Sequence, residues 1–334
     1  MTQHVRTAPV GVVFGSLTPP EHLAAGSRLA EELGFADLWF SEDCFFTGAM
    51  SGLTQMLAST RRIPVGLGLA STQTRHPALL AMELAGLTRM HPGRVRATLG
   101  LGNTHWLHQM GVMPQRPLSA LLHDFDAVRS LLAGKTVTSP GDPGHTLADV
   151  TLPFPPDVDV PLLMGAVNER ALRAAGAHAD GVLLSVLAGT GYVRWAKERV
   201  AEGAASVGRT PPPITAFVLA SVDDDPERAE TAVVDAVRFF ARAELHTSLI
   251  GRSAITDEQR ILGDWDSSTR AELVAEYAAA GTPGQVAGRL RSLLESGADA
   301  VGLWVLPSDE LEPQLQVLAE RVLPELGGTV LGQA

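Results

Sequence analysis

The sequence predicts an α/β fold, a single (β/α)8 TIM barrel with inserted loops. Eight short apolar runs alternate with segments of helical periodicity. Runs such as VGLGLA (65–70) and AVGLWVL (300–306) are apolar throughout, which is typical of parallel strands buried on both faces. The competing fold is an open doubly wound sheet. It is disfavoured because Gly11 and Gly15 do not have the Gly-x-Gly-x-x-Gly spacing.

Residues 63–102 contain one strand–helix–strand unit in full. An apolar run at 63–69 precedes Pro77, which suits the first turn of a helix because its missing N–H has no partner there. Apolar side chains then recur at helical spacing up to Met90, and His-Pro-Gly ends the helix. A second strand follows at 94–101. Two strands joined by one such helix are expected to be parallel neighbours.

The same alternation predicts the remaining elements. Strands are expected at 10–14, 36–41, 161–166, 180–185, 214–221 and 298–306. Helices are expected after Thr18 and at 49–60, 117–133, 169–177, 192–207, 225–242, 282–296 and 310–326. Thr18 with Glu21, and Thr282 with Gln285, have the spacing of capping boxes. The whole chain, 1–334, is read as one domain with insertions at about 134–160, a loop or short hairpin, and at about 243–280, a polar and irregular segment.

Composition narrows the class of protein. With 334 residues, of which 45% are hydrophobic and 19% charged, the chain can bury a large core. The net charge of −11 makes nucleic acid and an anionic membrane surface unfavourable partners. One cysteine allows no internal disulfide, the start lacks a signal peptide, and no apolar run could span a bilayer. We therefore expect a cytoplasmic protein.

Several chemistries lack their sequence signatures. The ten histidines show no His-Glu-x-x-His spacing and there is no cysteine pair, so no metal site is predicted. A Gly-x-Ser-x-Gly elbow and a Walker loop are also absent, which disfavours nucleophilic acyl transfer and phosphoryl transfer.

The candidate site is a ring of residues at the ends of the predicted strands, which meet at one mouth in a barrel. Asp43 and His105 could transfer a proton. Small residues leave room for a flat ring, and the segment from Gly165 to Asn168 could direct N–H groups at a phosphate. Each residue also has a structural reading, as a solvated carboxylate, a packing histidine or a turn glycine. The strand-end residues predicted to bind a cofactor are Glu42, Ala70, Ser71, Gly102, Asn103, Gly165, Ala166, Val167, Leu184 and Ser185.

Over nearly its whole length the chain resembles the bacterial luciferase-like superfamily, which includes flavin-dependent monooxygenases and oxidoreductases that use the deazaflavin coenzyme F-420. The resemblance is carried by AEELGFADLWFSED, TRHPALLAMELAGLTRMHPGRVRATLGLG, VPLLMGAVNERALRAAGAHADGVLLS and GTPGQVAGRLRSLLESGADAVGLWV. The third stretch is more similar to the methylenetetrahydromethanopterin-reductase-like F-420 branch than to the luciferases.

The resemblance implies roles for several residues. The cofactor ring would lie in the mouth against a non-prolyl cis peptide near residues 69–71. Gly165, Ala166, Val167, Leu184 and Ser185 would hold the cofactor phosphate. Two residues depart from the family pattern: Asp43 stands where many members have a catalytic histidine, and His105 lies near the position of a glutamate acid.

Three functions are consistent with these features. The favoured one is an F-420-dependent oxidoreductase that transfers a hydride to or from a small organic substrate, with Asp43 or His105 handling the proton. The alternatives are a two-component monooxygenase that receives reduced FMN from a separate reductase, and a non-catalytic flavin-binding barrel. The resemblance and the apolar helices of the N-terminal half also predict a homodimer.

Overall fold

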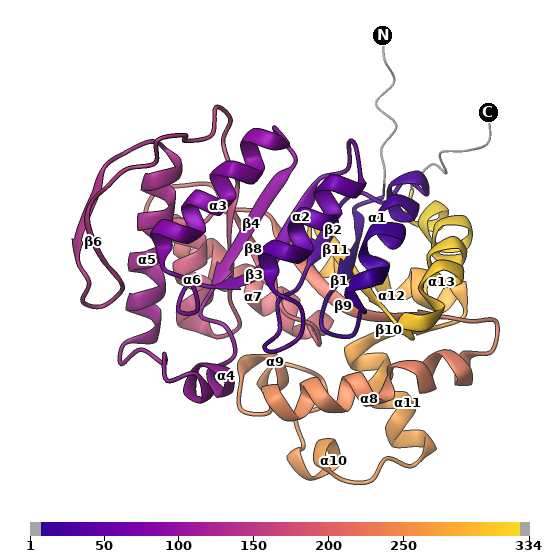
Figure 1. Ribbon diagram of the computed structural model, residues 1–334. Helices are drawn as coiled ribbons and strands as arrows, with labels where there is room; N and C mark the ends of the chain where they lie inside the picture. Colours follow the sequence, from indigo (N-terminus) through magenta and orange to yellow (C-terminus); the bar gives the residue numbers. More distant parts are fainter. Residues whose placement is uncertain (1–7, 328–334) are drawn as a thin grey trace.

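The computed structural model describes residues 8–327, and within them eight parallel strands form a closed barrel (Figure 1). Strand β1 pairs with β11 and strand β8 pairs with β9, which completes the ring. The predicted TIM barrel and its eight predicted strands are confirmed, as is the parallel pairing of β3 with β4. The strands are β1 (Val10–Phe14), β2 (Leu38–Phe40), β3 (Val65–Ser71), β4 (Val95–Gly100), β7 (Leu162–Gly165), β8 (Gly181–Leu184), β9 (Ile214–Val222) and β11 (Ala300–Val305).

Helices surround the barrel. They include α1 (Leu23–Glu32), α2 (Ala49–Ser59), α3 (Pro77–Met90), α5 (Pro117–Leu132), α6 (Glu169–His178), α7 (Thr190–Ser206), α8 (Pro226–Glu244), α12 (Pro283–Ser296) and α13 (Leu311–Val317), and α13 continues as π and 3-10 turns to Leu326. Among residues 8–327, none of these helices combines the length and apolar character that a bilayer crossing requires.

One of the two predicted capping boxes is confirmed. Thr282 and Gln285 make both reciprocal bonds at the start of α12. The box at Thr18 is wrong, because the Thr18 hydroxyl accepts the N–H of Gly15 and a 3-10 turn precedes α1.

Large side chains from some strands occupy the space left by glycines on others inside the barrel. A Cβ atom added to Gly66 would lie 2.3 Å from the Trp39 ring, and one added to Gly68 would lie 2.7 Å from Phe217. Trp39 and Phe217 are buried and meet edge to face at 5.7 Å between ring centroids. The glycines of β3 therefore make room for core side chains, as in other filled barrels.

An ion pair lies at the N-terminal end of the barrel interior. The Asp37 carboxylate accepts hydrogen bonds from Trp39 Nε1 at 2.8 Å and from Arg96 Nη1 at 2.9 Å. Burial raises the pKa of Asp37, while the charge of Arg96 and these two hydrogen bonds oppose the shift. These side chains therefore occupy the N-terminal end of the barrel interior.

Two segments interrupt the barrel pattern. Within 134–160, β5 (Val137–Pro140) and β6 (Thr146–Val150) form an antiparallel hairpin that lies beside α3 and α5, at the left of Figure 1. The expectation of an irregular segment at 243–280 is wrong. This segment contains α9 (Ser248–Gly251), α10 (Glu258–Leu262), α11 (Ser267–Tyr277) and β10 (Ala278–Gly281). Strand β10 pairs in parallel with the last four residues of β9.

Candidate active site at the barrel mouth

A pocket lies beyond the C-terminal ends of β2, β3 and β4. The space that it outlines is about 270 Å³ when open solvent is included, and the cavity itself is about 20 Å³. Four of the predicted site residues line it: Glu42, Ser71, Gly102 and Asn103. The other lining residues are Cys44, Leu69, Thr74, Trp106, Leu107 and Met110. Strand ends far apart in the sequence therefore converge here, as the barrel fold requires.

Leu69 forms part of the pocket floor. The peptide bond between Gly68 and Leu69 is cis, at the edge of the stretch 69–71 where the family resemblance places such a bond. A Cβ atom on Gly100 would lie 2.8 Å from Leu69 Cδ2, and one on Gly165 would lie 2.4 Å from the same atom. Gly165, predicted to bind cofactor, thus gives space to the side chain that lines the pocket.

The loop after β3 is fixed to the end of β4. The Ser71 hydroxyl donates to the Leu101 carbonyl at 2.5 Å and accepts the backbone N–H of Gln73 at 3.1 Å. The Thr74 hydroxyl donates to the Ser71 carbonyl at 3.2 Å. Glycine is required at position 102 for two reasons. Its φ is 87°, and a Cβ atom there would lie 2.9 Å from the Cβ atom of Ser71.

Glu42 is held in a bidentate ion pair with Arg75. Their nitrogen–oxygen distances are 2.6 and 2.7 Å, and Glu42 Oε1 also accepts the N–H of Ala49 at the start of α2. The hydrogen bond to Glu42 raises the pKa of the Arg75 guanidinium. Both charges are therefore neutralised within the protein, and Glu42 holds the β2–α2 loop in place. Cofactor binding by Glu42 stays a prediction.

Asp43 lies in the sequence between the pocket-lining residues Glu42 and Cys44 but does not itself line the pocket. Its Oδ2 atom is buried and has no hydrogen-bond partner among residues 8–327. Burial raises the pKa of the Asp43 carboxyl, a hydrogen bond from Ser16 opposes the shift, and the nearby charge of Glu42 adds to it. A carboxyl group with a raised pKa beside a pocket suits general acid catalysis, because it retains its proton closer to neutral pH.

His105 does not line the pocket, and no described hydrogen bond joins it to Asp43. It lies exposed on α4 (Thr104–Gln109), a helix that the sequence did not predict, and its backbone N–H donates to Asn103 Oδ1 at 2.9 Å. The same helix directs Trp106 and Leu107 to the pocket. Proton transfer by His105 therefore stays a prediction.

Several predicted cofactor-binding residues can offer only their backbone to the mouth. The side chains of Ala70, Ala166 and Leu184 are buried in the layer between the strands and the helices. Ser185 is half-buried after β8, and the Val167 carbonyl accepts the Tyr192 hydroxyl at 2.7 Å. Burial raises the pKa of that hydroxyl, which keeps it a hydrogen-bond donor.

The start of α6 has free backbone donors. No side chain within the described residues caps this helix, because Asn168 at the N-cap instead accepts the N–H of Ser248 at 2.9 Å. The first N–H groups of α6 can therefore bind an anion, with the helix dipole adding to the attraction. The Asn168–Ser248 bond also joins this site to the 243–280 segment.

Comparison with known proteins identifies the family. Residues 4–300 match the profile of the luciferase-like monooxygenase family. The chain belongs to this family. The 5,10-methylenetetrahydromethanopterin reductase of Methanolobus tindarius is 27% identical over 306 residues, which cover 87% of this chain and 92% of the reductase. The chain is thus an oxidoreductase of the luciferase-like family.

Solved structures have the same fold. The coenzyme F-420-dependent tetrahydromethanopterin reductase from Methanopyrus kandleri matches this luciferase-like chain with a TM-score of 0.80 and 22% identity, covering 96% of this chain and 100% of that one. An F-420-dependent secondary alcohol dehydrogenase, solved with an F-420–acetone adduct, matches with a TM-score of 0.79 and 20% identity, covering 96% and 98%.

Sequence reasoning did not assign Thr74, Leu107 or Met110 to the site, and it placed Leu69 there only through the family resemblance. Thr74 had a usable signal, since it follows a strand end within a polar loop. Leu107 and Met110 depend on α4, whose signal was the N-capping residue Asn103 directly after a strand. Leu69 has no signal in its own residue pattern, because an apolar residue at the end of an apolar strand looks like core; only the family resemblance pointed to it.

Proposed function

We propose that this luciferase-like protein is an F-420-dependent oxidoreductase that transfers a hydride to or from a small organic substrate. The observation that carries the proposal is the buried, unpartnered Oδ2 atom of Asp43, a residue that does not line the pocket itself but whose chain neighbours Glu42 and Cys44 do. A proton held there can neutralise the charge that develops on a substrate heteroatom when a hydride reaches the adjacent carbon. The 27% identity to an enzyme named methylenetetrahydromethanopterin reductase supports this choice.

The residues present fit a deazaflavin or flavin. Two buried polar atoms at this end of the barrel, Asp43 Oδ2 and Trp304 Nε1, lack partners among the described residues, and the start of α6 offers free N–H groups to a phosphate. When bound, the cofactor would supply or accept the hydride. The protein would hold its phosphate with the backbone at 165–171, support its ring with Leu69, and exclude water with Trp106 and Met110.

The rim of the mouth favours an uncharged, apolar substrate. Leu17, Phe45 and Phe46 are exposed on the loops that follow β1 and β2. The Arg75 guanidinium, which contacts the pocket-lining Glu42, is already paired with that carboxylate. A ketone, alcohol or imine with an apolar body therefore fits the site better than a phosphorylated substrate.

Cofactor binding tests the proposal directly. The purified protein is titrated with reduced F-420 and, in parallel, with reduced FMN, and binding is followed by fluorescence. Tight binding of F-420 and hydride transfer without oxygen uptake are expected. Lack of affinity for either cofactor contradicts the proposal.

The second candidate is a two-component monooxygenase that takes reduced FMN from a separate reductase. The match to the luciferase-like monooxygenase profile favours it, and the backbone donors of α6 serve either cofactor. Oxygen consumption with reduced FMN, absent with F-420, would select it. A third reading, a non-catalytic flavin-binding barrel, requires that Asp43→Ala and His105→Ala leave any activity intact.

We also propose a homodimer. The outward face of α3 exposes Leu79, Met82 and Met90 at helical spacing. Gly86 lies between them, and a Cβ atom there would meet nothing within 4 Å. A second copy of this helix could approach closely and cover this apolar stripe.

A further inference from the structure

A second group of ionisable side chains surrounds Asp124, in the middle of α5. Asp124 is fully buried and accepts four hydrogen bonds. The donors are the Gln73 amide at 3.2 Å, His123 Nδ1 at 3.1 Å, the His145 backbone N–H at 2.9 Å and His145 Nδ1 at 2.8 Å. These donors come from the loop after β3, from α5 itself and from the tip of the β5–β6 hairpin, so one carboxylate joins three segments.

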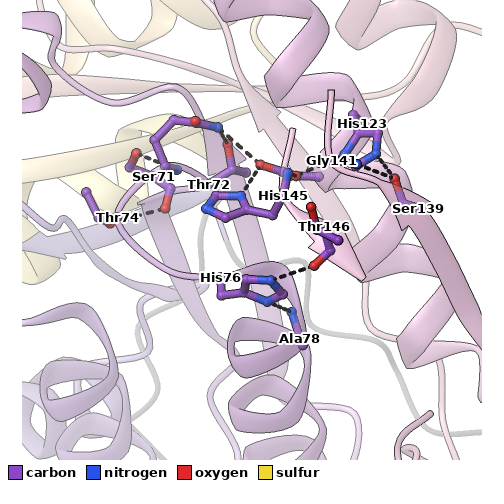
Figure 2. Close-up of polar contacts among 12 residues, drawn as sticks. Ser71, Thr72, Thr74, His76, Ala78, His123, Ser139, Gly141, His145 and Thr146 are labelled. Carbon is purple, nitrogen blue, oxygen red and sulfur yellow. Dashed lines mark hydrogen bonds and ion pairs between the residues drawn. The ribbon is translucent and has the colours of Figure 1, made fainter. Parts of the chain in front are cut away.

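The partners of the ring nitrogens (Figure 2) assign one tautomer to each of His76 and His123 in its neutral form. His123 donates from Nδ1 to Asp124, so its Nε2 accepts the Ser139 hydroxyl of β5. His76 accepts the Ala78 N–H at Nδ1, which caps α3, so its Nε2–H donates to the Thr146 carbonyl at 3.0 Å. The hairpin is thus attached to the barrel by directed bonds.

These groups do not form a metal site. Within residues 8–327, no three histidine, cysteine or carboxylate side chains are arranged to hold a metal ion. The rings of His76 and His145 pack edge to face with centroids 5.0 Å apart. Their nitrogens face the hairpin backbone and Asp124 instead of a common point. The cluster is therefore a connection between segments.

Gln73 carries this connection to the pocket. Its side-chain amide donates both to Asp124 and to the Thr72 hydroxyl, the latter at 3.0 Å, and its backbone N–H donates to Ser71 Oγ. Gln73 and Thr72 are buried, whereas Ser71 and Thr74 on either side of them line the pocket. The Gln73 amide, held by the buried Asp124 carboxylate, thus adds to the bonds from Ser71 and Thr74 that fix this pocket wall.

We propose that Asp124 and Gln73 are positioning residues that hold the 71–74 wall of the pocket, with the β5–β6 hairpin as its outer support. The loop has no regular structure, so hydrogen bonds must fix it, and those to a charged acceptor are the strongest available. The hairpin, although outside the barrel, then belongs to the machinery that shapes the site. The ligand-binding part of this inference rests on the proposed function.

Gln73→Leu is the decisive variant, because it cuts the link to the loop and leaves Asp124 three of its four donors. Its matched control is Gln55→Leu, at an exposed glutamine on α2. We expect Gln73→Leu to weaken binding of reduced F-420 or FMN about 10-fold, the loss typical of one hydrogen bond to a charged group. Amide exchange should become faster in 71–76 only. Asp124→Asn should also speed exchange in the hairpin tip, 141–147.

The outcomes separate this inference from the proposed function. If the wild type binds a cofactor and Gln73→Leu binds it equally well, the positioning role is overturned and the proposed function stands. If the wild type binds neither cofactor, the proposed function fails. In that case faster exchange at 71–76 in Gln73→Leu still supports the link to Asp124, and unchanged exchange overturns it. Should Asp124→Asn fail to fold, Gln73→Leu alone decides.

Discussion

Replacing Asp43 by asparagine should make the protein more stable and less active above neutral pH. Burial raises the pKa of Asp43, and its Oδ2 atom has no partner among residues 8–327. A carboxyl group whose folded-state pKa exceeds its unfolded value favours folding while it is protonated. That contribution is complete at low pH. It is lost as the pH rises through the raised pKa, because the fold must then hold a buried charge.

The size of the effect follows from the surroundings of the carboxylate. A buried polar group without a partner costs roughly 1–3 kcal/mol, and more if it is charged. Asparagine removes the charge and keeps an acceptor for Ser16, but it leaves an amide in the same place. The net gain should be about 1 kcal/mol at about pH 8, a rise in Tm of about 2 °C. At about pH 4 the difference should be smaller, because protonation of the wild-type carboxyl removes the buried charge.

Two assays check this prediction. Thermal unfolding of the wild type, Asp43→Asn and the exposed control Asp159→Asn at both pH values measures the stability difference. Single-turnover hydride transfer should fall about 100-fold or more in Asp43→Asn if Asp43 is the proton donor. The wild-type rate should also fall as the pH rises through the Asp43 pKa. A lower Tm for Asp43→Asn at the higher pH, or the same increase at both, would refute the reasoning.

Three further predictions concern the pocket and the dimer. Glu42→Gln should lower the free energy of unfolding by about 2 kcal/mol in a urea titration, because the part-buried Arg75 loses its bidentate partner; an unchanged midpoint would contradict this. Leu79→Glu should turn a dimer into a monomer by light scattering, and a wild-type monomer would rule the interface out. Gly165→Ala should weaken cofactor binding because its Cβ would lie 2.4 Å from Leu69 Cδ2. Adding Leu69→Ala should relieve the clash and restore part of the binding, and no recovery would argue against this contact.

The strands could be predicted because parallel strands are buried on both faces and leave apolar runs in the sequence. Strand β10 could not, since Ala278–Gly281 reads AAAG and has no β-branched residue. It becomes a strand because it pairs beside the end of β9, and this tertiary context overrides its weak local preference. Helix α4 escaped prediction because six residues are too few to show helical periodicity.

The sequence also predicted only part of the site, because side-chain direction and tertiary contacts leave no local pattern. Placement at strand ends correctly brought Glu42 and Ser71 to one pocket. Side chains alternate between the two faces of a strand, but apolar runs hide which residues point outward. Ala70 and Leu184 therefore looked equivalent to Ser71, although their side chains face the surrounding helices. The link from Gln73 to Asp124 spans 51 positions between two segments with no shared pattern, so no sequence signal marked it.

The filled interior of the barrel has a kinetic consequence. Trp39, Phe217 and the Asp37–Arg96 pair close the passage below the mouth, so reactants and products share one entrance. Under the proposed function, the cofactor held against Leu69 would arrive before the substrate and leave after the product. Turnover should follow a compulsory order. Product-inhibition patterns should be competitive only between the first molecule to bind and the last to leave.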